Sequence, residues 1–214
     1  YESEYVKRDI NKSIYYLTLA ANQNDLESQF FLGGIYYNGE YIKRDINKAI
    51  HYFTLSANQN HLKAQYTLGS IYLKSEYVQQ DINKAIHYFT LASNQNHPEA
   101  QYSLGGIYYK GEYIERDIYK SIHYFTLASN QNHPYAQFCL GVFFYRGEYV
   151  ERDINKSIHY FILAANQNHI KAQYYLGDIY YESEYVKRDI NKSIYYLTLA
   201  ANQNDLESHF FLGG

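Results

Sequence analysis

The sequence repeats itself every 36 residues, and this period constrains the fold more than any other feature of the chain. An Asp-x-x-Lys pattern marks each of six copies, and its aspartates are Asp9, Asp45, Asp81, Asp117, Asp153 and Asp189. A period of this length is typical of solenoids, in which each unit buries its apolar face only against its neighbours. We therefore predict one array of stacked repeats over residues 1–214.

Each copy predicts a pair of antiparallel α-helices. In the central copy the first helix is expected from Pro98 to about Tyr109, and Gly111 supplies the left-handed residue that ends it. Asp117 is expected to cap the second helix, whose apolar residues recur at helical spacing. The second helix is expected to close at Asn132, because asparagine tolerates the left-handed conformation. The predicted fold class is all-α.

Several positions do not vary among the copies, which indicates that packing fixes them. A glycine in the middle of each first helix costs roughly 1 kcal/mol relative to alanine, so another helix is expected to approach closely there. We predict a core between successive repeats formed by Leu32, Leu68, Leu104, Leu140, Leu176, Gly33, Gly69, Gly105, Gly141 and Gly177. The predicted caps of the second helices are Asp45, Asp81, Asp117 and Asp153.

Composition and charge exclude several classes of protein. The net charge is −3 and the pI is about 6.3, so the chain has no broad basic field and nucleic acid is not an expected partner. Cys139 is the only cysteine, so a disulfide-stapled extracellular fold is not expected. No run of about 18 apolar residues is present, so no membrane span is predicted. We expect an intracellular, cytoplasmic protein.

The residues predict no catalytic, metal or cofactor site, and we do not expect an enzyme. The nine histidines recur in columns, and equivalent helices about 8–10 Å apart hold neighbouring columns too far apart to share a metal ion. The Arg44-Asp45 dipeptide is similar to part of a kinase catalytic loop, but that loop needs asparagine where Ile50 stands. Cys139 lies at a variable position and no histidine partner is repeated for it.

Two spaced patterns in the central copy carry a family resemblance: Ala100-x-x-x-Leu104-Gly105-x-x-Tyr108-x-x-Gly111 and Asp117-x-x-Lys120-Ser121-x-x-Tyr124-x-x-x-Ala128. They resemble the Sel1-like repeat, a relative of the tetratricopeptide repeat, and the match extends over the whole chain. The resemblance implies a right-handed α/α superhelix that serves as an adaptor in protein assembly. Asn132 stands where the family usually has an inter-helix glycine, and the cysteine pairs of its secreted branch are absent.

Variation among the copies concentrates on one stripe of the first helix, at spacing i, i+4, i+7, i+11. The resemblance implies that this helix lines the concave side of the array. We interpret the stripe as a partner-binding groove, and the alternative is neutral drift on a solvated face. Tyr135, Val142 and Arg146 are the best anchor candidates, because aromatic residues and arginine dominate interface energetics. The candidate binding residues are Phe31, Lys63, Thr67, Lys74, Lys110, Tyr135, Cys139, Val142, Arg146 and Tyr175.

The two ends of the sequence are nearly identical. Residues 1–34 and 181–214 differ only at Gln29 and His209, an offset of 180 residues or five repeats. Both ends fall within the first helix of a repeat, so we expect a piece of a longer protein. Head-to-tail stacking of such ends would give a filament-like contact. A structural spacer, or a self-stacking component of a filament or lattice, is therefore the alternative to a protein-binding scaffold.

Overall fold

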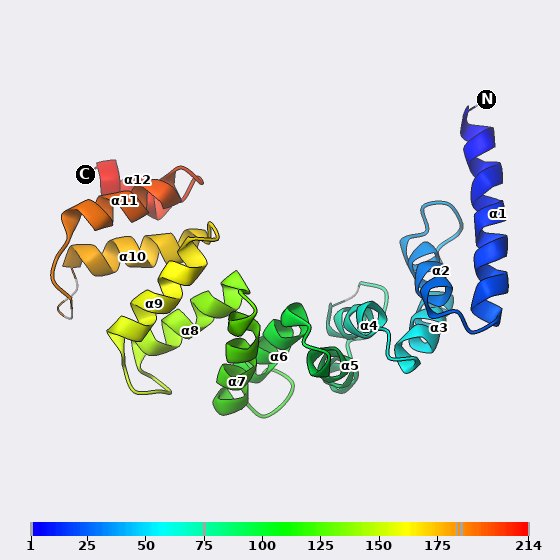
Figure 1. Cartoon of the computed structure of the whole chain (residues 1–214), viewed down its shortest axis with the longest axis horizontal. Helices are drawn as coiled ribbons and strands as arrows, with labels where there is room; N and C mark the ends of the chain where they lie inside the picture. Colours follow the sequence, from blue (N-terminus) through cyan, green and yellow to red (C-terminus); the bar gives the residue numbers. More distant parts are fainter. Residues whose placement is uncertain (1, 75, 183, 185, 214) are drawn as a thin grey trace. The chain divides into compact units, whose positions relative to one another are not determined.

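The computed structural model describes residues 2–74, 76–182, 184 and 186–213. Its contacts divide the chain into two compact units, residues 1–100 and 101–214, and each is described by itself. Figure 1 shows the helices along the chain. The bounds are α1 Glu2–Asn22, α2 Leu26–Asn38, α3 Ile46–Asn58, α4 Leu62–Lys74, α5 Ile82–Asn94, α6 Pro98–Lys110, α7 Ile118–Asn130, α8 Pro134–Arg146, α9 Ile154–Ala165, α10 Ile170–Glu182, α11 Ile190–Ala201 and α12 Leu206–Gly213.

The predicted all-α solenoid is confirmed, since the described residues contain helices and no strand. Even-numbered helices are the first helices of the repeats, and odd-numbered helices are the second. The aspartate before each of α3, α5, α7, α9 and α11 accepts a hydrogen bond from the backbone amide three residues later, at 2.9–3.0 Å. These bonds satisfy amides that have no acceptor inside the helix.

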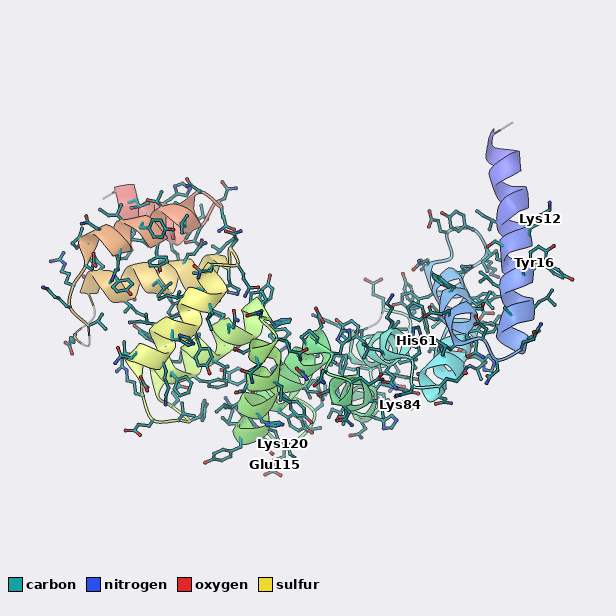
Figure 2. The ribbon with its side chains drawn as sticks, in the orientation of Figure 1. Lys12, Tyr16, His61, Lys84, Glu115 and Lys120 are labelled. Atoms are coloured by element: carbon teal, nitrogen blue, oxygen red, sulfur yellow. The ribbon has the colours of Figure 1, made fainter. Side chains whose placement is uncertain are left out.

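In the five copies after the first, the lysine of the Asp-x-x-Lys pattern also joins the two helices of its repeat. Lys120 Nζ lies 3.3 Å from the Asp117 carboxylate and 5.1 Å from the centre of the Tyr108 ring. The Tyr108 ring stacks on Tyr124, with 5.8 Å between their centres. Equivalent ion pairs and ring stacks occur in the other four repeats, and Figure 2 labels Lys84 and Lys120 of this series. The repeating Lys therefore binds a carboxylate and an aromatic face together.

The fixed glycines allow contact between the two helices of one repeat, and this differs from the prediction of a contact between repeats. A Cβ built on Gly105 of α6 would lie 2.6 Å from Cδ1 of Phe125, which belongs to α7 of the same repeat. The same holds for Gly33, Gly69 and Gly141, and Gly177 meets Leu197 instead of a phenylalanine. The leucine before each glycine is buried, with 0–1% of Leu32, Leu68, Leu104, Leu140 and Leu176 exposed.

Buried glutamines of the first helices, which we call the glutamine ladder, bond to a glutamine of their own repeat and, in four copies, to a carbonyl of the repeat before it. Gln137 of α8 is 1% exposed, donates to the carbonyl of Ser129 and accepts a hydrogen bond from Gln167 at 2.8 Å. Equivalent glutamine pairs lie within four other repeats, at 2.7–2.8 Å. The ladder explains why every copy has a glutamine directly before the asparagine that ends its second helix, such as Gln131 before Asn132, because a buried amide without partners would be costly. His209 stands at the ladder position of Gln29, so the one difference between the near-identical ends falls on this ladder.

The first copy departs from the predicted pair of helices. Residues 2–22 form one continuous helix, α1, where the other copies turn between their first and second helices. In the other copies the amide of the repeat aspartate donates to a tyrosine or phenylalanine carbonyl of the preceding helix, as Asp45 does to Tyr36 at 3.0 Å. The predicted helix ends at Ser75 and Ser183 lie outside the described residues.

Asparagine closes the second helix of every repeat in the left-handed conformation, with φ between 62° and 68° at Asn24, Asn60, Asn96, Asn132, Asn168 and Asn204. Gly39, Gly111 and Gly147 do the same for the first helices.

We expect Asn132→Ala to lower the free energy of unfolding by about 1 kcal/mol, because a residue with an ordinary Cβ is strained at positive φ. Asn132→Gly should change it by only a few tenths, because glycine adopts this conformation without strain. Asn130→Ala is the matched control, since Asn130 is the last residue of α7 and is exposed. Urea unfolding of the three variants measures the effect. Equal losses for Asn130→Ala and Asn132→Ala would contradict the role of the backbone conformation.

Candidate protein-binding groove

A groove of about 740 Å³ lies in the second unit and is lined by side chains of α8, α10 and α12 together with the end of α6 and the residues after α8. We call it the helix-A groove, and its central residues are Phe138, Cys139, Val142, Arg146, Tyr175 and Leu206. The first helices contribute these side chains because they stack in register, so positions one period apart come side by side.

Four of the ten candidate residues line this groove. Cys139, Val142 and Arg146 follow one another along α8 at helical spacing, and Tyr175 is the α10 counterpart of Cys139. Val142 and Cys139 are half-buried and Arg146 is exposed. The variable stripe of two successive repeats thus forms one continuous concavity.

The other six candidates lie elsewhere. Lys110 and Tyr135 belong to the second unit, where Lys110 is exposed and Tyr135 contacts His169 at 4.9 Å between ring centres. The candidates of the first unit are exposed or half-buried along α2 and α4: Phe31, Lys63, Thr67 and Lys74. Phe31 is the most prominent of these, with 56% of it exposed.

Tyr175 is held in place by a cluster of aromatic rings. The centre of its ring lies 5.1 Å from that of Phe161, 5.7 Å from Tyr145 and 5.8 Å from Phe138. Phe161 is fully buried at 0% exposure, so the cluster continues into the core of the second unit. A ring fixed on several sides loses little conformational entropy when a ligand packs on it.

Phe138, Tyr174 and Leu206 also line the groove, although they do not belong to the variable stripe of the first helices. Phe138 and Tyr174 belong to a column that is aromatic in every copy: Phe30, Tyr66, Tyr102, Phe138, Tyr174 and Phe210. Because this column holds Phe or Tyr in every copy, it is not part of the variable stripe and was not predicted to bind a partner. A column that stays aromatic beside a variable stripe is the signal that could have identified it.

The charges of the groove are unevenly distributed. On α8 the Arg146 guanidinium lies 3.8 Å from the Glu148 carboxylate, so this cation is already paired. Around Tyr174 the field is negative: burial, and then the charges of Asp178, Glu207 and Asp205, raise the pKa of its phenol. The groove therefore has an acidic end at Tyr174.

Asp178 lies one turn after Tyr174 and Tyr175 on α10, and its side chain is not among those that line the groove. Burial, and next the nearby charge of Glu182, raise the pKa of its carboxyl above the usual value. The other copies have Gly34, Ser70, Gly106 and Val142 at this position, so only α10 places a charge there among the described side chains. Among the side chains that the structure describes, no cation lies within ion-pair distance of Asp178.

Cys139 lies in the groove but is a poor nucleophile. Burial raises the pKa of its thiol to about 12, so almost none of it is thiolate near neutral pH. Its surroundings are apolar or aromatic, and Tyr102 and Phe138 are among its neighbours in the second unit. This thiol serves as part of the apolar lining.

The repeating histidines before the first helices act as helix caps. His97, His133 and His169 accept a hydrogen bond at Nδ1 from the backbone amide three residues later, at 3.2–3.3 Å. His61 instead places Nδ1 2.7 Å from Ser56 Oγ and Nε2 3.5 Å from Glu27. Within the described parts of the chain, no group of three His, Cys, Asp or Glu side chains could hold a metal ion.

Stability should fall as the pH is lowered, through His169. Burial lowers the pKa of this imidazole from 6.5 to about 4, and a protonated Nδ1 could no longer accept the bond from Ala172. Because the folded pKa lies below the unfolded one, the neutral form stabilises the fold above pH 6.5, and this contribution is lost as the pH falls towards 4. Thermal melting against pH should show a smaller decrease in Tm for His169→Asn, which keeps a capping acceptor and does not titrate. If Tm fell with decreasing pH as steeply in His169→Asn as in the wild-type chain, this assignment would be contradicted.

None of the helices in the described residues is long and apolar enough to cross a membrane.

Comparison with known families and structures identifies the repeat. The family model described as Sel1 repeat matches residues 1–25, 26–61, 62–97, 98–133, 134–169 and 170–205. A Sel1 repeat protein from Oxalobacter formigenes is 29% identical with a TM-score of 0.81, and the match covers 91% of this chain and 56% of that protein. A search of curated protein sequences gives no match.

Two more distant structures share the fold. The protein c5321, a protective antigen present in uropathogenic Escherichia coli strains, is 24% identical with a TM-score of 0.64 over 94% of this chain and 50% of that protein. The immunity protein Pa5087 from Pseudomonas aeruginosa is 18% identical with a TM-score of 0.51, over 88% of this chain and 72% of that protein. The chain thus spans about half the length of the first two relatives.

Proposed function

Because the chain belongs to the Sel1 repeat family, whose members are generally protein-interaction scaffolds, we propose that it binds a partner protein through the helix-A groove. The observation that supports this most is that the positions that vary among the repeats lie together on a concave surface. Positions that packing does not fix, Cys139, Val142, Arg146 and Tyr175, meet in one concavity with an apolar floor. Solenoids bind partners on such surfaces, where the scaffold is constant and the lining differs from repeat to repeat.

The groove has the composition of a recognition site rather than of a reaction centre. Its anchors are aromatic and aliphatic side chains with arginine at the edge, the residue types that contribute most to binding energy. Its one thiol is held in the neutral form by burial. We propose that the chain has no catalytic activity of its own and acts by holding other proteins together.

Selection of peptides tests the groove directly. Short random peptides displayed on phage are panned on the immobilised chain and then on the Val142→Glu and Arg146→Glu variants. We expect peptides that bind the wild-type chain and lose binding to both variants. Glu115→Gln is the control, because Glu115 precedes α7, at the lower edge of the molecule in Figure 2, and does not line the groove. Circular dichroism melting shows that each variant is folded. If no peptide depends on Val142 or Arg146, the proposal is wrong.

A second candidate function is self-association, and exposed apolar side chains favour it. On α12, Leu206 is 81% and Phe210 86% exposed, whereas the equivalent Phe30 packs against Phe53 and His61. Figure 2 shows Lys12 and Tyr16 projecting from α1 on the side away from α2. A second copy could cover α12 with its own α1, which has the sequence of a second helix with Leu17 at the position of Phe53.

Light scattering across a range of concentrations distinguishes the two candidates. Self-association predicts an average mass that rises with concentration and returns to the monomer value in Phe210→Ser, a substitution at a residue that does not line the groove. An average mass that stays constant with concentration would exclude self-association and leave binding of a partner protein as the proposed function.

A further inference from the structure

The histidines that precede the first helices differ in their surroundings, although they stand at the same position of the repeat. The His169 ring stacks on Phe138 of the helix-A groove, with 4.5 Å between centres and 21° between planes, whereas the His61 ring meets Phe30 at 88°. Ser56 accounts for the difference, because every other copy has alanine at its position. Its Oγ lies 2.7 Å from Nδ1 of His61 and draws this nitrogen away from the helix-capping position.

The Ser56 hydroxyl allows His61 to keep its contacts in both protonation states. A hydroxyl both donates and accepts, so it serves Nδ1 with or without a proton. When Nδ1 carries the proton, Oγ accepts from it and donates its own hydrogen to the carbonyl of Leu26, 2.8 Å away. Nε2 lies 3.5 Å from the Glu27 carboxylate, an acceptor for the second N–H of a protonated ring. Burial lowers the pKa of this imidazole, and the charge of Glu27 opposes this effect more strongly than that of Lys63 reinforces it.

His169 depends on a partner that cannot adapt. Its Nδ1 accepts a hydrogen bond from the backbone amide of Ala172, 3.2 Å away, and an amide N–H only donates. A proton on Nδ1 therefore removes the cap of α10. Burial lowers the pKa of this imidazole to about 4, and the positive charge of Lys171 acts in the same direction. Tyr135 faces the ring from α8, and among the described residues no carboxylate pairs with His169.

His97 shows a third arrangement. Its Nδ1 lies 3.3 Å from the backbone amide of Ala100, as in the other caps, but also 3.2 Å from the Glu99 carboxylate. A protonated His97 therefore keeps an acceptor, which the positive Lys171 does not offer to His169.

The part of α10 that the cap of His169 holds in place forms one wall of the groove. Lys171, Tyr174 and Tyr175 lie in the first two turns of α10, and all three line the groove. We propose that acid opens the helix-A groove: protonation of His169 releases the start of α10, whereas the Ser56 hydroxyl protects the equivalent start of α4. This inference rests on the proposed function, because it concerns the regulation of the same groove.

Hydrogen exchange at the start of α10 tests the acid response without any ligand. The pKa of His169 is about 4 in the closed structure and 6.5 in a solvated ring, so the ratio of open to closed α10 should rise roughly twentyfold between pH 7 and pH 5. We expect this loss of protection, corrected for the intrinsic pH dependence of exchange, at the amides of residues 172–176. The amides of residues 64–68 in α4 are the control in the same sample and should change much less. His169→Asn should abolish the pH dependence at α10, because its side chain caps and does not titrate.

Moving the serine between the two junctions tests the cause. Ala164 is the counterpart of Ser56, and both are 0% exposed. Ala164→Ser should supply the hydroxyl to His169, so the pKa of this imidazole, followed by NMR, should rise from about 4 and exchange at α10 should lose most of its pH dependence. Ser56→Ala should have the reverse effect at α4. Circular dichroism melting at pH 7 shows that each variant is folded.

Release of a groove peptide connects the acid response to binding. We use a labelled peptide from the pool that depends on Val142, chosen without Asp, Glu or His. Its dissociation, followed by anisotropy, should be several-fold faster at pH 5 than at pH 7 in the wild-type chain. The rate should not change with pH in His169→Asn.

The outcomes separate this inference from the proposed function. Equal changes in exchange at α4 and α10, or a change at α10 that persists in His169→Asn, overturn the inference and leave the proposed function intact. A dissociation rate that is the same at pH 5 and pH 7, with exchange at α10 rising as expected, overturns the control of the groove. If no peptide depends on Val142 or Arg146, the proposed function fails and control of the groove fails with it, while exchange and NMR still decide the acid response of α10.

Discussion

Phe161→Ala is expected to lower the free energy of unfolding by about 3–5 kcal/mol, the largest effect of any single substitution considered for this protein. Phe161 is fully buried, and its ring lies against Gly141 on one side and Phe138 and Tyr175 on the other. Removing the ring leaves a cavity that neighbouring rings fixed in their own contacts cannot fill. Urea unfolding followed by circular dichroism measures the loss.

The repeat itself supplies the control for this prediction. In the last complete repeat, Leu197 occupies the equivalent position and would lie 2.5 Å from a Cβ on Gly177. Phe161→Leu should therefore cost only about 1.5 kcal/mol or less, because this architecture already accepts leucine at that site. A similar loss for the alanine and leucine variants would show that the ring itself, rather than filled volume, is what the site requires. Peptide binding should also weaken in Phe161→Ala, since Tyr175 loses its support.

Gly105→Ala and Gly106→Ala are expected to change stability in opposite directions, although the two residues are adjacent in α6. A Cβ on Gly105 would lie 2.6 Å from Phe125 Cδ1, and that ring is packed in a core cluster and cannot withdraw. A Cβ on Gly106 meets nothing within 4 Å. We expect Gly105→Ala to cost about 1–2 kcal/mol even after the gain in helix propensity, and Gly106→Ala to add about 0.5–1 kcal/mol.

The same unfolding measurements decide this second prediction. Because both substitutions insert alanine into the same helix, the difference between them reports the contact with Phe125 alone. A stabilising effect at both positions would mean that the two helices of the repeat can separate at little cost. A destabilising effect at both would mean that Gly106 has a contact that the structure does not describe.

Most of the fold could be predicted from the sequence because the determinants of each repeat are local. Each helix end is fixed by a residue that acts within a few positions of itself: an aspartate cap, an asparagine at positive φ or a glycine. The same pattern occurs in successive copies, which makes it easy to recognise. The glycines in the middle of the first helices were correctly linked to a close approach. The predicted contact with a neighbouring repeat was wrong, because an unvarying glycine indicates that another helix packs closely but does not indicate which helix.

The candidate groove could be predicted only in part. Helical periodicity placed Cys139, Val142 and Arg146 on one face of α8, but it could not tell which stripe residues of different repeats come together. The acidic character around Tyr174 depends on Asp178 from α10 and Glu207 from α12, which lie 29 residues apart in the sequence. Charges at this separation combine only when the helices are stacked.

The sequence by itself determined the repeat: its length, its two helices, their caps and the positions that do not vary. These follow from hydrogen bonds and backbone conformations that are settled within one repeat. The tertiary structure decided which side chain fills the space over each glycine, the glutamine ladder, and which residues line the groove. These depend on contacts between residues that are distant in the sequence, and such contacts are fixed by packing rather than by local preference.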